Sequence, residues 1–265
     1  MVTLWRQYTV ASDRPIRLLQ VTDMHLQQEP SCLMRGANVE ARFQQVIHQI
    51  EQENADFLLL TGDLTHHAPT AYDRLSSCLQ GLPFPAHWIP GNHDLVDEMA
   101  RFSDLGYNQK VIVRGDWRII LLDSTSNPDG KGGGALSAEE LDFLNTQLAI
   151  LTSEQHVLVV LHHHPVSVES EWMDQIGLAN KDRLWELLAH YSQVKGVVFG
   201  HVHQEFQQQR GNVKLLACPA TAPQFKPFSV SAVTEDDPRF MGPAYRRIQL
   251  YDDGEIQSEV VRLRS

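Results

Sequence analysis

The chain has 265 residues, of which 42% are hydrophobic and 21% charged, and its formal net charge is −11 at pH 7. This composition is typical of a globular protein, and the negative charge disfavours nucleic-acid binding because long polyanions would be repelled. The sequence has no long apolar stretch, so we expect no membrane span, and its first residues lack the apolar core of a secretory signal. Three cysteines far apart in the sequence argue against a disulfide framework, so we expect a cytoplasmic location.

The predicted elements alternate between apolar strands and amphipathic helices along most of the chain. Apolar runs predict strands, and apolar residues spaced three and four apart predict helices. In chain order we expect a strand over 16–23, a helix over 38–53, strands over 56–63, 86–94 and 117–124, a helix from Ser137 through Leu151, a strand over 156–165, a helix around 184–191, strands over 195–203 and 213–219, and a hairpin around Asp253 and Gly254. This alternation predicts an α/β fold. We expect a single domain over 1–265, because strand and helix signals directly flank the glycine-rich loop 127–137.

Polar residues gather where the apolar strands end. They form five blocks, in the order Asp23-x-His25, Gly62-Asp63, Gly91-Asn92-His93-Asp94, His162 and Gly200-His201-x-His203. In open α/β sheets, ligands bind at the carboxyl ends of the strands. A single Asp or His at a strand end is more often a cap or a structural residue, but five blocks in order favour one common site.

The candidate ligands combine carboxylates, an amide oxygen and imidazoles, without a thiolate. This set suits divalent iron, manganese or zinc, and it does not suit an iron–sulfur cluster or a cysteine-rich structural zinc site. Seven candidates exceed what one ion needs, whereas two ions that share a bridging carboxylate would use them all. Two metal ions held in this way are a common device for phosphoryl displacement.

These five blocks, in this order, resemble the calcineurin-like metallophosphoesterase superfamily. The surrounding "LLQVTDMHL", "IPGNHD", "LHHHP" and "GHVHQE" are similar to the bacterial class III cyclic-nucleotide phosphodiesterases. The segment 218–227, "CPATAPQFKP", is also similar to a C-terminal segment of the bacterial cyclic-AMP phosphodiesterases. The resemblance implies a four-layer α-β-β-α sandwich with the site at the strand ends.

The resemblance also implies a role for each residue of the blocks. The first metal ion would be held by Asp23, His25, Asp63 and His203, and the second by Asp63, Asn92, His162 and His201. His93 would lie beside the scissile phosphate as the catalytic residue. The substrate would contact His25, Asp63, Asn92, His93, His162 and His203. The implied cofactors are two divalent ions, iron or manganese with zinc as an alternative, and the implied reaction is hydrolysis of 3',5'-cyclic AMP to 5'-AMP by a hydroxide that bridges them.

Two other functions are considered beside this one. A dimetal phosphodiesterase could act instead on another small phosphodiester, such as a glycerophosphodiester or a nucleotide conjugate, because substrate choice depends on loops. A non-catalytic interaction scaffold is disfavoured, since no ligand position is replaced. We expect a small-molecule cyclic nucleotide as the partner, with no nucleic acid and no membrane. The oligomeric state and the preference for cyclic AMP over cyclic GMP stay open.

The sequence does not identify the residue that orients the His93 ring. Some phosphoprotein-phosphatase relatives carry an Asp shortly after the Gly-Asp block that pairs with the catalytic His, and this chain has Thr65, His66 and His67 there. We expect His66 and His67 to be surface loop residues, with lining of the substrate mouth as the alternative. For Asp94, structural capping and orientation of His93 are equally acceptable interpretations.

The three consecutive histidines before Pro165 are expected to have different roles. Strand alternation puts His162 and His164 on one face, and the resemblance selects His162 as the ligand. We expect His163 to face away from the metals toward packing, and His164 either to support the site or to cap the turn. Asp123 is expected either to be structural or to support a metal ligand without binding the metal itself.

Overall fold

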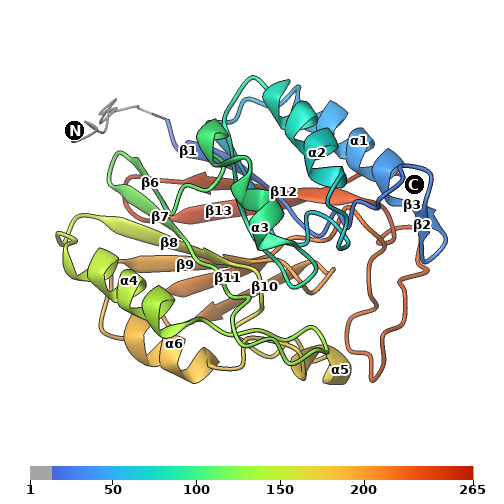
Figure 1. The fold of residues 1–265 in the computed structure, drawn as a ribbon. Coiled ribbons are helices and arrows are strands. Elements are labelled where there is room, and N and C mark those ends of the chain that lie inside the picture. Colours follow the sequence, from blue (N-terminus) through green and yellow to red (C-terminus); the bar gives the residue numbers. More distant parts are fainter. Residues whose placement is uncertain (1–13, 265) are drawn as a thin grey trace.

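Two β-sheets lie face to face in the centre of the molecule, and helices cover their outer faces (Figure 1). The computed structural model describes residues 14–264. The first sheet has the order β13-β12-β1-β4-β5 and the second the order β10-β11-β9-β8-β7-β6. Their strands are β1 (Ile16–Val21), β4 (Phe57–Thr61), β5 (Ala86–Ile89), β6 (Val111–Arg114), β7 (Trp117–Leu121), β8 (His156–Leu161), β9 (Val194–Phe199), β10 (Phe206–Arg210), β11 (Val213–Ala217), β12 (Ala244–Leu250) and β13 (Ile256–Arg262).

Helices and short elements complete the architecture. Helices α1 and α2 cover the first sheet, and α4 and α6 cover the second (Figure 1). The helices are α1 (Val39–Ile50), α2 (Ala71–Gln80), α3 (Val96–Ala100), α4 (Ala138–Ala149), α5 (Glu171–Asp174) and α6 (Lys181–Leu188), with a 3-10 turn at Ser103–Leu105 and a small hairpin of β2 (Leu33–Met34) and β3 (Ala37–Asn38). The predicted four-layer α-β-β-α sandwich is therefore confirmed.

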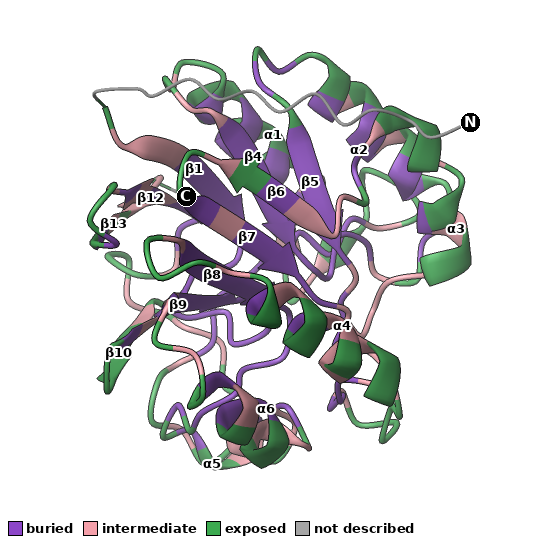
Figure 2. Cartoon of the chain, turned by 90° about the vertical axis from the view of Figure 1, so that its left-hand side faces the viewer, coloured by how far each residue is buried: buried purple, intermediate pink, exposed green. Residues whose placement is uncertain are grey.

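Alternation along single strands fills two separate apolar layers. On β8, Val157 and Val159 pack toward α4 and α6, while Leu158 and Val160 point into the layer between the sheets. The same division holds for β1, whose Leu19 belongs to the core under α1 and α2. Strands buried on both faces need apolar residues at every position, so these segments appear in the sequence as continuous apolar runs. Figure 2 shows the buried central strands and the exposed outer faces of the helices.

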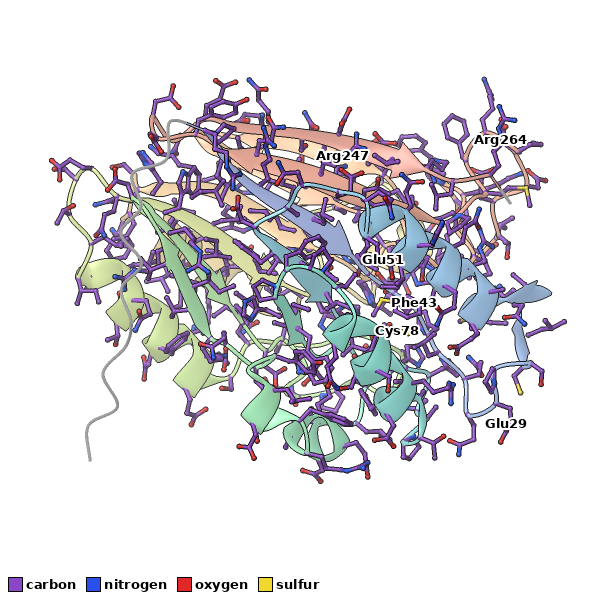
Figure 3. All side chains as sticks on the ribbon, turned by 90° about the horizontal axis from the view of Figure 1, so that it is seen from above. Glu29, Phe43, Glu51, Cys78, Arg247 and Arg264 are labelled. Atoms are coloured by element: carbon purple, nitrogen blue, oxygen red, sulfur yellow. The ribbon has the colours of Figure 1, made fainter. Side chains whose placement is uncertain are left out.

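Helices α1 and α2 run side by side across the first sheet. Phe43 of α1 and Cys78 of α2 lie near each other along their common boundary (Figure 3). The Gln44 amide also contacts the Cys78 sulfur at 3.2 Å. Helix α1 begins as predicted, because the Asn38 side chain accepts a hydrogen bond from the Ala41 amide.

Parallel pairing brings the predicted blocks to one edge. Strands β1, β4 and β5 are parallel in one sheet, and β7, β8, β9 and β11 are parallel in the other. The strands stop before their polar residues, as β1 does at Val21 and β8 at Leu161, so the candidate ligands lie on the following loops. The Gln20 amide donates to the Phe199 carbonyl at 2.8 Å and links the two sheets close to this edge. Within residues 14–264, no helix has both the length and the apolar composition needed to cross a bilayer.

The apolar layer between the sheets should contribute to the free energy of unfolding. Leu158 is fully buried there, so Leu158→Ala should lower the free energy of unfolding by about 2–5 kcal/mol through lost contacts and a residual cavity. Urea unfolding followed by circular dichroism measures this change. The control is Leu105→Ala at a half-exposed position, where we expect a change within about 0.5 kcal/mol. Equal effects of the two substitutions would contradict this packing.

Candidate metal centre and active site

All seven predicted ligand residues meet at the common edge of the two sheets. Nitrogen and oxygen atoms of Asp23, His25 and His203 lie within 4.8 Å of one another, and so do those of Asp23, Asp63 and His162. The remaining two, Asn92 and His201, contact the His162 ring at 3.2 Å each. Loops after β1, β4, β5, β8 and β9 supply these side chains, so both sheets contribute to one site.

The first half of the site surrounds the Nε2 atoms of His25 and His203. These two nitrogens face each other at 3.1 Å. The Asp23 Oδ1 atom lies 3.4 Å from His203 Nε2, and Asp63 Oδ2 lies 3.5 Å from His25 Nε2. Asp23 Oδ1 is buried and has no hydrogen-bond donor among the described residues. A buried carboxylate oxygen without a donor, facing imidazole nitrogens, fits a cation.

The second half is built around His162. Its Nε2 atom lies 3.2 Å from Asn92 Oδ1, 3.2 Å from His201 Nδ1 and 3.5 Å from Asp63 Oδ2. The same Asp63 oxygen is therefore 3.5 Å from a nitrogen in each half. This position suits a carboxylate that bridges two ions.

Outer contacts fix which nitrogen of each ring turns inward. His162 Nδ1 donates to the Thr61 carbonyl at 2.8 Å, and His203 Nδ1 donates to the Pro223 carbonyl at 2.7 Å. When a metal ion displaces the inner proton, the remaining proton stays on the outer nitrogen and the Nε2 lone pair can bind the ion. Asp23 is held in a similar way, because its Oδ2 accepts from the Thr22 hydroxyl and the His201 amide.

The backbone at the site adopts a conformation that non-glycine residues rarely take. The φ angles of Asp23, His25, Asp63, His201 and His203 all lie between 48° and 71°. This left-handed conformation costs free energy for residues with a Cβ atom, and it turns each side chain sharply off the end of its strand. Gly200 in the last block allows its backbone to pass close to Thr22, because a Cβ atom at this position would lie 2.2 Å from the Thr22 hydroxyl.

Neighbouring charges keep the buried carboxylates of the site ionised. Burial would raise the pKa of Asp63, but His162 and His25 outweigh it and hold this pKa well below the usual range. Burial would likewise lower the pKa of His162, but the Asp63 carboxylate raises it to about 9. Burial lowers the pKa of His25 to about 3. The carboxylates are thus charged at neutral pH and attract cations.

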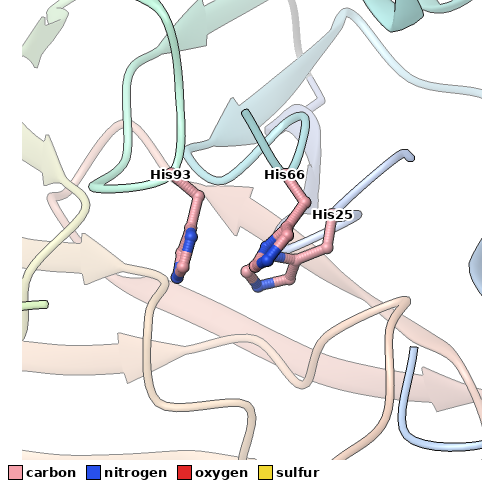
Figure 4. A group of neighbouring side chains, drawn as sticks. All are labelled: His25, His66 and His93. Atoms are coloured by element: carbon pink, nitrogen blue, oxygen red, sulfur yellow. The ribbon is translucent and has the colours of Figure 1, made fainter. Parts of the chain in front are cut away.

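His93 lies at the edge of this cluster and is half-buried. Its backbone amide donates to Asp63 Oδ1 at 2.8 Å, which ties it to the centre of the site. Its Nδ1 atom is 3.1 Å from His67 Nε2, and its ring is stacked on His66 with 4.4 Å between centroids. Figure 4 shows the rings of His93, His66 and His25 side by side. As expected, both residues lie on the loop after β4, where His67 is exposed and His66 half-buried, and both rings also contact His93.

Asp94 braces two of the ligand-bearing loops. Its carboxylate accepts hydrogen bonds from the Leu64, Thr65 and Gly91 amides at 2.9–3.0 Å and from the Tyr72 hydroxyl at 2.8 Å. Among the hydrogen bonds of residues 14–264, it makes none to the His93 ring. The interpretation as a structural cap is therefore the one that the geometry supports. Burial and the charge of Asp63 raise the pKa of Asp94 to about 7.

The three consecutive histidines lie in different surroundings. Both nitrogens of His163 contact the loop that precedes α4, with Ser124 Oγ at 2.8 Å and the Gly132 carbonyl at 3.1 Å. The ring is buried and packs against His201 at 4.9 Å between centroids, so its packing partner is itself a candidate ligand. The His164 ring also stacks on His201, with 5.5 Å between centroids. Both histidines thus support the His201 ring.

Comparison with known proteins identifies relatives over nearly the whole chain. The family model described as calcineurin-like phosphoesterase matches residues 16–205. A Haemophilus influenzae protein named 3',5'-cyclic adenosine monophosphate phosphodiesterase CpdA is 36% identical over 97% of this chain and 93% of its own length. Proteins of the same name from Pseudomonas aeruginosa and Escherichia coli are 37% and 35% identical over 96% of this chain. Among solved structures, a dimetal phosphatase from Danio rerio shares the fold with a TM-score of 0.67 at 13% identity, covering 94% of this chain and 99% of that one.

The brace at Asp94 predicts a large effect on stability. Asp94→Ala removes the acceptor of three backbone amides and one hydroxyl, so the free energy of unfolding should fall by about 2–4 kcal/mol. Urea unfolding in the presence of a chelator measures this without a contribution from metal binding. Asp97→Ala, at an exposed position on α3, should change it by no more than about 0.5 kcal/mol. If both variants unfold at the same urea concentration, the brace does not stabilise the loops.

Proposed function

Since this chain belongs to the calcineurin-like phosphoesterase family, we propose that it hydrolyses 3',5'-cyclic AMP to 5'-AMP with two divalent metal ions. The family matches the resemblance seen in the five sequence blocks. The observation that carries the proposal is that seven residues with oxygen or nitrogen ligand atoms meet at one edge of the sheets. Among them, one Asp63 oxygen lies 3.5 Å from a nitrogen of His25 and 3.5 Å from a nitrogen of His162. The substrate follows from relatives that bear the name of a cyclic AMP phosphodiesterase and that this chain matches over more than nine tenths of their length.

We assign the ligands of the two ions as follows. The first ion is held by Asp23, His25, Asp63 and His203, and the second by Asp63, Asn92, His162 and His201. Iron or manganese is the expected metal and zinc the alternative, because imidazole and carboxylate ligands accept all three. Such a pair of ions neutralises phosphate charge and makes water a usable nucleophile near neutral pH.

The protein contributes position and proton transfer to the reaction. His93 is tied to Asp63 through its backbone amide, so its ring lies beside the place where a phosphate would meet the ligand cluster. We assign it either to stabilise charge on the phosphate or to protonate the leaving 3'-oxygen. The substrate phosphate contacts the inward-facing side chains His25, Asp63, Asn92, His93, His162 and His203.

The chain acts as one metallophosphoesterase domain in this proposal. Support comes from the ligands themselves, which are drawn from the strand ends of both sheets and leave neither sheet with a complete site. We also propose a cytoplasmic location, which the unpaired cysteines Cys32, Cys78 and Cys218 support.

A parallel assay tests the proposed substrate. The purified enzyme, loaded with manganese or iron, is given cyclic AMP, cyclic GMP, a glycerophosphodiester and bis-(p-nitrophenyl) phosphate at equal concentrations. We expect 5'-AMP from cyclic AMP with the highest kcat/KM among the natural phosphodiesters, and no product after chelation. A higher kcat/KM for the glycerophosphodiester would contradict cyclic AMP as the substrate, but it would not contradict the proposed metal chemistry.

His93→Ala separates catalysis from metal binding. Because His93 is not assigned as a ligand, the variant should retain two ions per chain, while kcat falls by about 10²-fold or more because charge stabilisation or proton transfer at the phosphate is lost. Elemental analysis and steady-state kinetics on one preparation give both numbers. Normal turnover in this variant would show that His93 is not catalytic.

His162→Ala and His163→Ala distinguish neighbouring histidines. The first should lower the metal content from two ions toward one, since His162 lies at the centre of the second half of the site. The second should retain two ions and lower the melting temperature, because His163 bonds Ser124 and Gly132. Two retained ions in His162→Ala would contradict the assignment of that ligand.

A further inference from the structure

Arg35 lies at the tip of the hairpin of β2 and β3, next to the first half of the site. Met34 of this hairpin packs against a buried cluster that includes Ala220 and Ala222, from the segment after β11. The Ala222 amide in turn donates to the Asp23 carbonyl at 3.2 Å. Figure 1 shows the hairpin at one end of the sheets. These contacts hold the hairpin at the edge that carries the candidate metal ligands.

The Arg35 guanidinium is held over an aromatic ring that contacts the site. Its Cζ atom lies 4.9 Å from the centre of the Phe225 ring. Phe225 in turn packs on His203, which is assigned to the first ion, with 4.8 Å between ring centroids. The Phe225 amide also donates to the His203 carbonyl at 3.2 Å. His203 and Phe225 are buried and Arg35 is exposed, so the three side chains lead outward from the metal cluster to solvent.

Arg35 differs in its charge balance from most arginines that lie over aromatic rings. Within residues 14–264, the following make an ion pair with a carboxylate: Arg101, Arg239, Arg247 and Arg262. In the same part of the chain, Arg35 and Arg210 make no ion pair. An exposed guanidinium without a carboxylate partner keeps its planar face and its donors available for a ligand.

The position of Arg35 indicates which part of a bound nucleotide it meets. Among the contacts of residues 14–264, it reaches the assigned ligands only through Phe225, whereas the substrate phosphate lies among those ligands themselves. The base is the planar group at the other end of a nucleotide. Bases stack on arginine guanidinium planes as they do on aromatic rings, because both offer a flat face.

We propose that Arg35, held in place by Phe225, binds the base of the substrate by stacking its guanidinium plane on it, and so favours nucleotides over phosphodiesters that lack a base. This inference rests on the proposed function, because it requires a nucleotide at the site. It can be tested without turnover, since 5'-AMP and ribose 5-phosphate share the sugar phosphate and differ in the base.

Calorimetric titration of the metal-loaded, full-length protein with these two compounds isolates the contribution of the base. The wild type should bind 5'-AMP more tightly than ribose 5-phosphate. Arg35→Ala should weaken binding of 5'-AMP by about tenfold, the contribution of one stacked base, and leave binding of ribose 5-phosphate unchanged. Arg35→Lys keeps the charge without the planar face, so it should bind 5'-AMP as weakly as Arg35→Ala.

Arg210→Ala is the matched control for this experiment. Arg210 is also exposed, also lies over an aromatic ring, that of Trp185, and stands at the end of β10 remote from His203. Its removal should leave both affinities at the wild-type value. Equal weakening of both compounds in Arg35→Ala would place Arg35 at the phosphate instead of the base. Wild-type affinity for 5'-AMP in Arg35→Lys, or a wild type that binds the two compounds equally, would also overturn the inference.

Kinetics with cyclic AMP give a second measurement. The KM of Arg35→Ala should rise about tenfold while kcat changes by less than about threefold, because stacking on the base is the same in the ground state and the transition state. A fall in kcat at unchanged KM would contradict a role in base binding. Absence of cyclic AMP hydrolysis in the wild type would overturn the proposed function, and the titration with 5'-AMP would still decide the role of Arg35.

Discussion

Two ionised carboxylates, Asp23 and Asp63, lie buried among imidazole rings at one edge of the structure, and the rest of the fold depends on holding them there. Burying such charges is unfavourable unless cations or donors balance them. The chain supplies donors to one oxygen of each carboxylate, through the Thr22 hydroxyl and the His201 amide for Asp23 and the His93 amide for Asp63. The other oxygens face the imidazole nitrogens, where two divalent ions would complete the balance.

This constraint explains why the two sheets must pack as they do. Asp23, Asp63 and Asn92 follow strands of one sheet, and His162 and His201 follow strands of the other. Metal ions bound at this site would therefore hold the sheets to each other, in addition to the apolar layer between them. Because ions bind the folded site and not the separated loops, metal content and stability are linked by mass action. The left-handed backbone angles of the candidate ligands lie at this same edge, and the packing of the two sheets offsets their cost in free energy.

Much of the fold and the gathering of the candidate ligands could be predicted from sequence because both leave local signals. Apolar runs mark strands buried on both faces, and polar blocks directly after them mark the strand ends. Asp94 stands in one of these blocks, but its role could not be decided from sequence, because only the tertiary structure brings Tyr72 of α2 and the Leu64 and Thr65 amides to it. The contacts of His66 and His67 with His93 could not be predicted from sequence either, because they join two loops whose relative placement depends on the pairing of β4 with β5. Helix α2 itself was missed, although four buried apolar residues line its inner face.

The central claim is that two metal ions share the Asp63 carboxylate. Anomalous diffraction from crystals of the metal-loaded protein, collected at the absorption edge of the loaded metal, tests it most directly. The account predicts two peaks about 3.5–4 Å apart, one on the His25 and His203 side of Asp63 and one on the His162 and His201 side. A single peak, or two peaks that do not both contact Asp63, would contradict it.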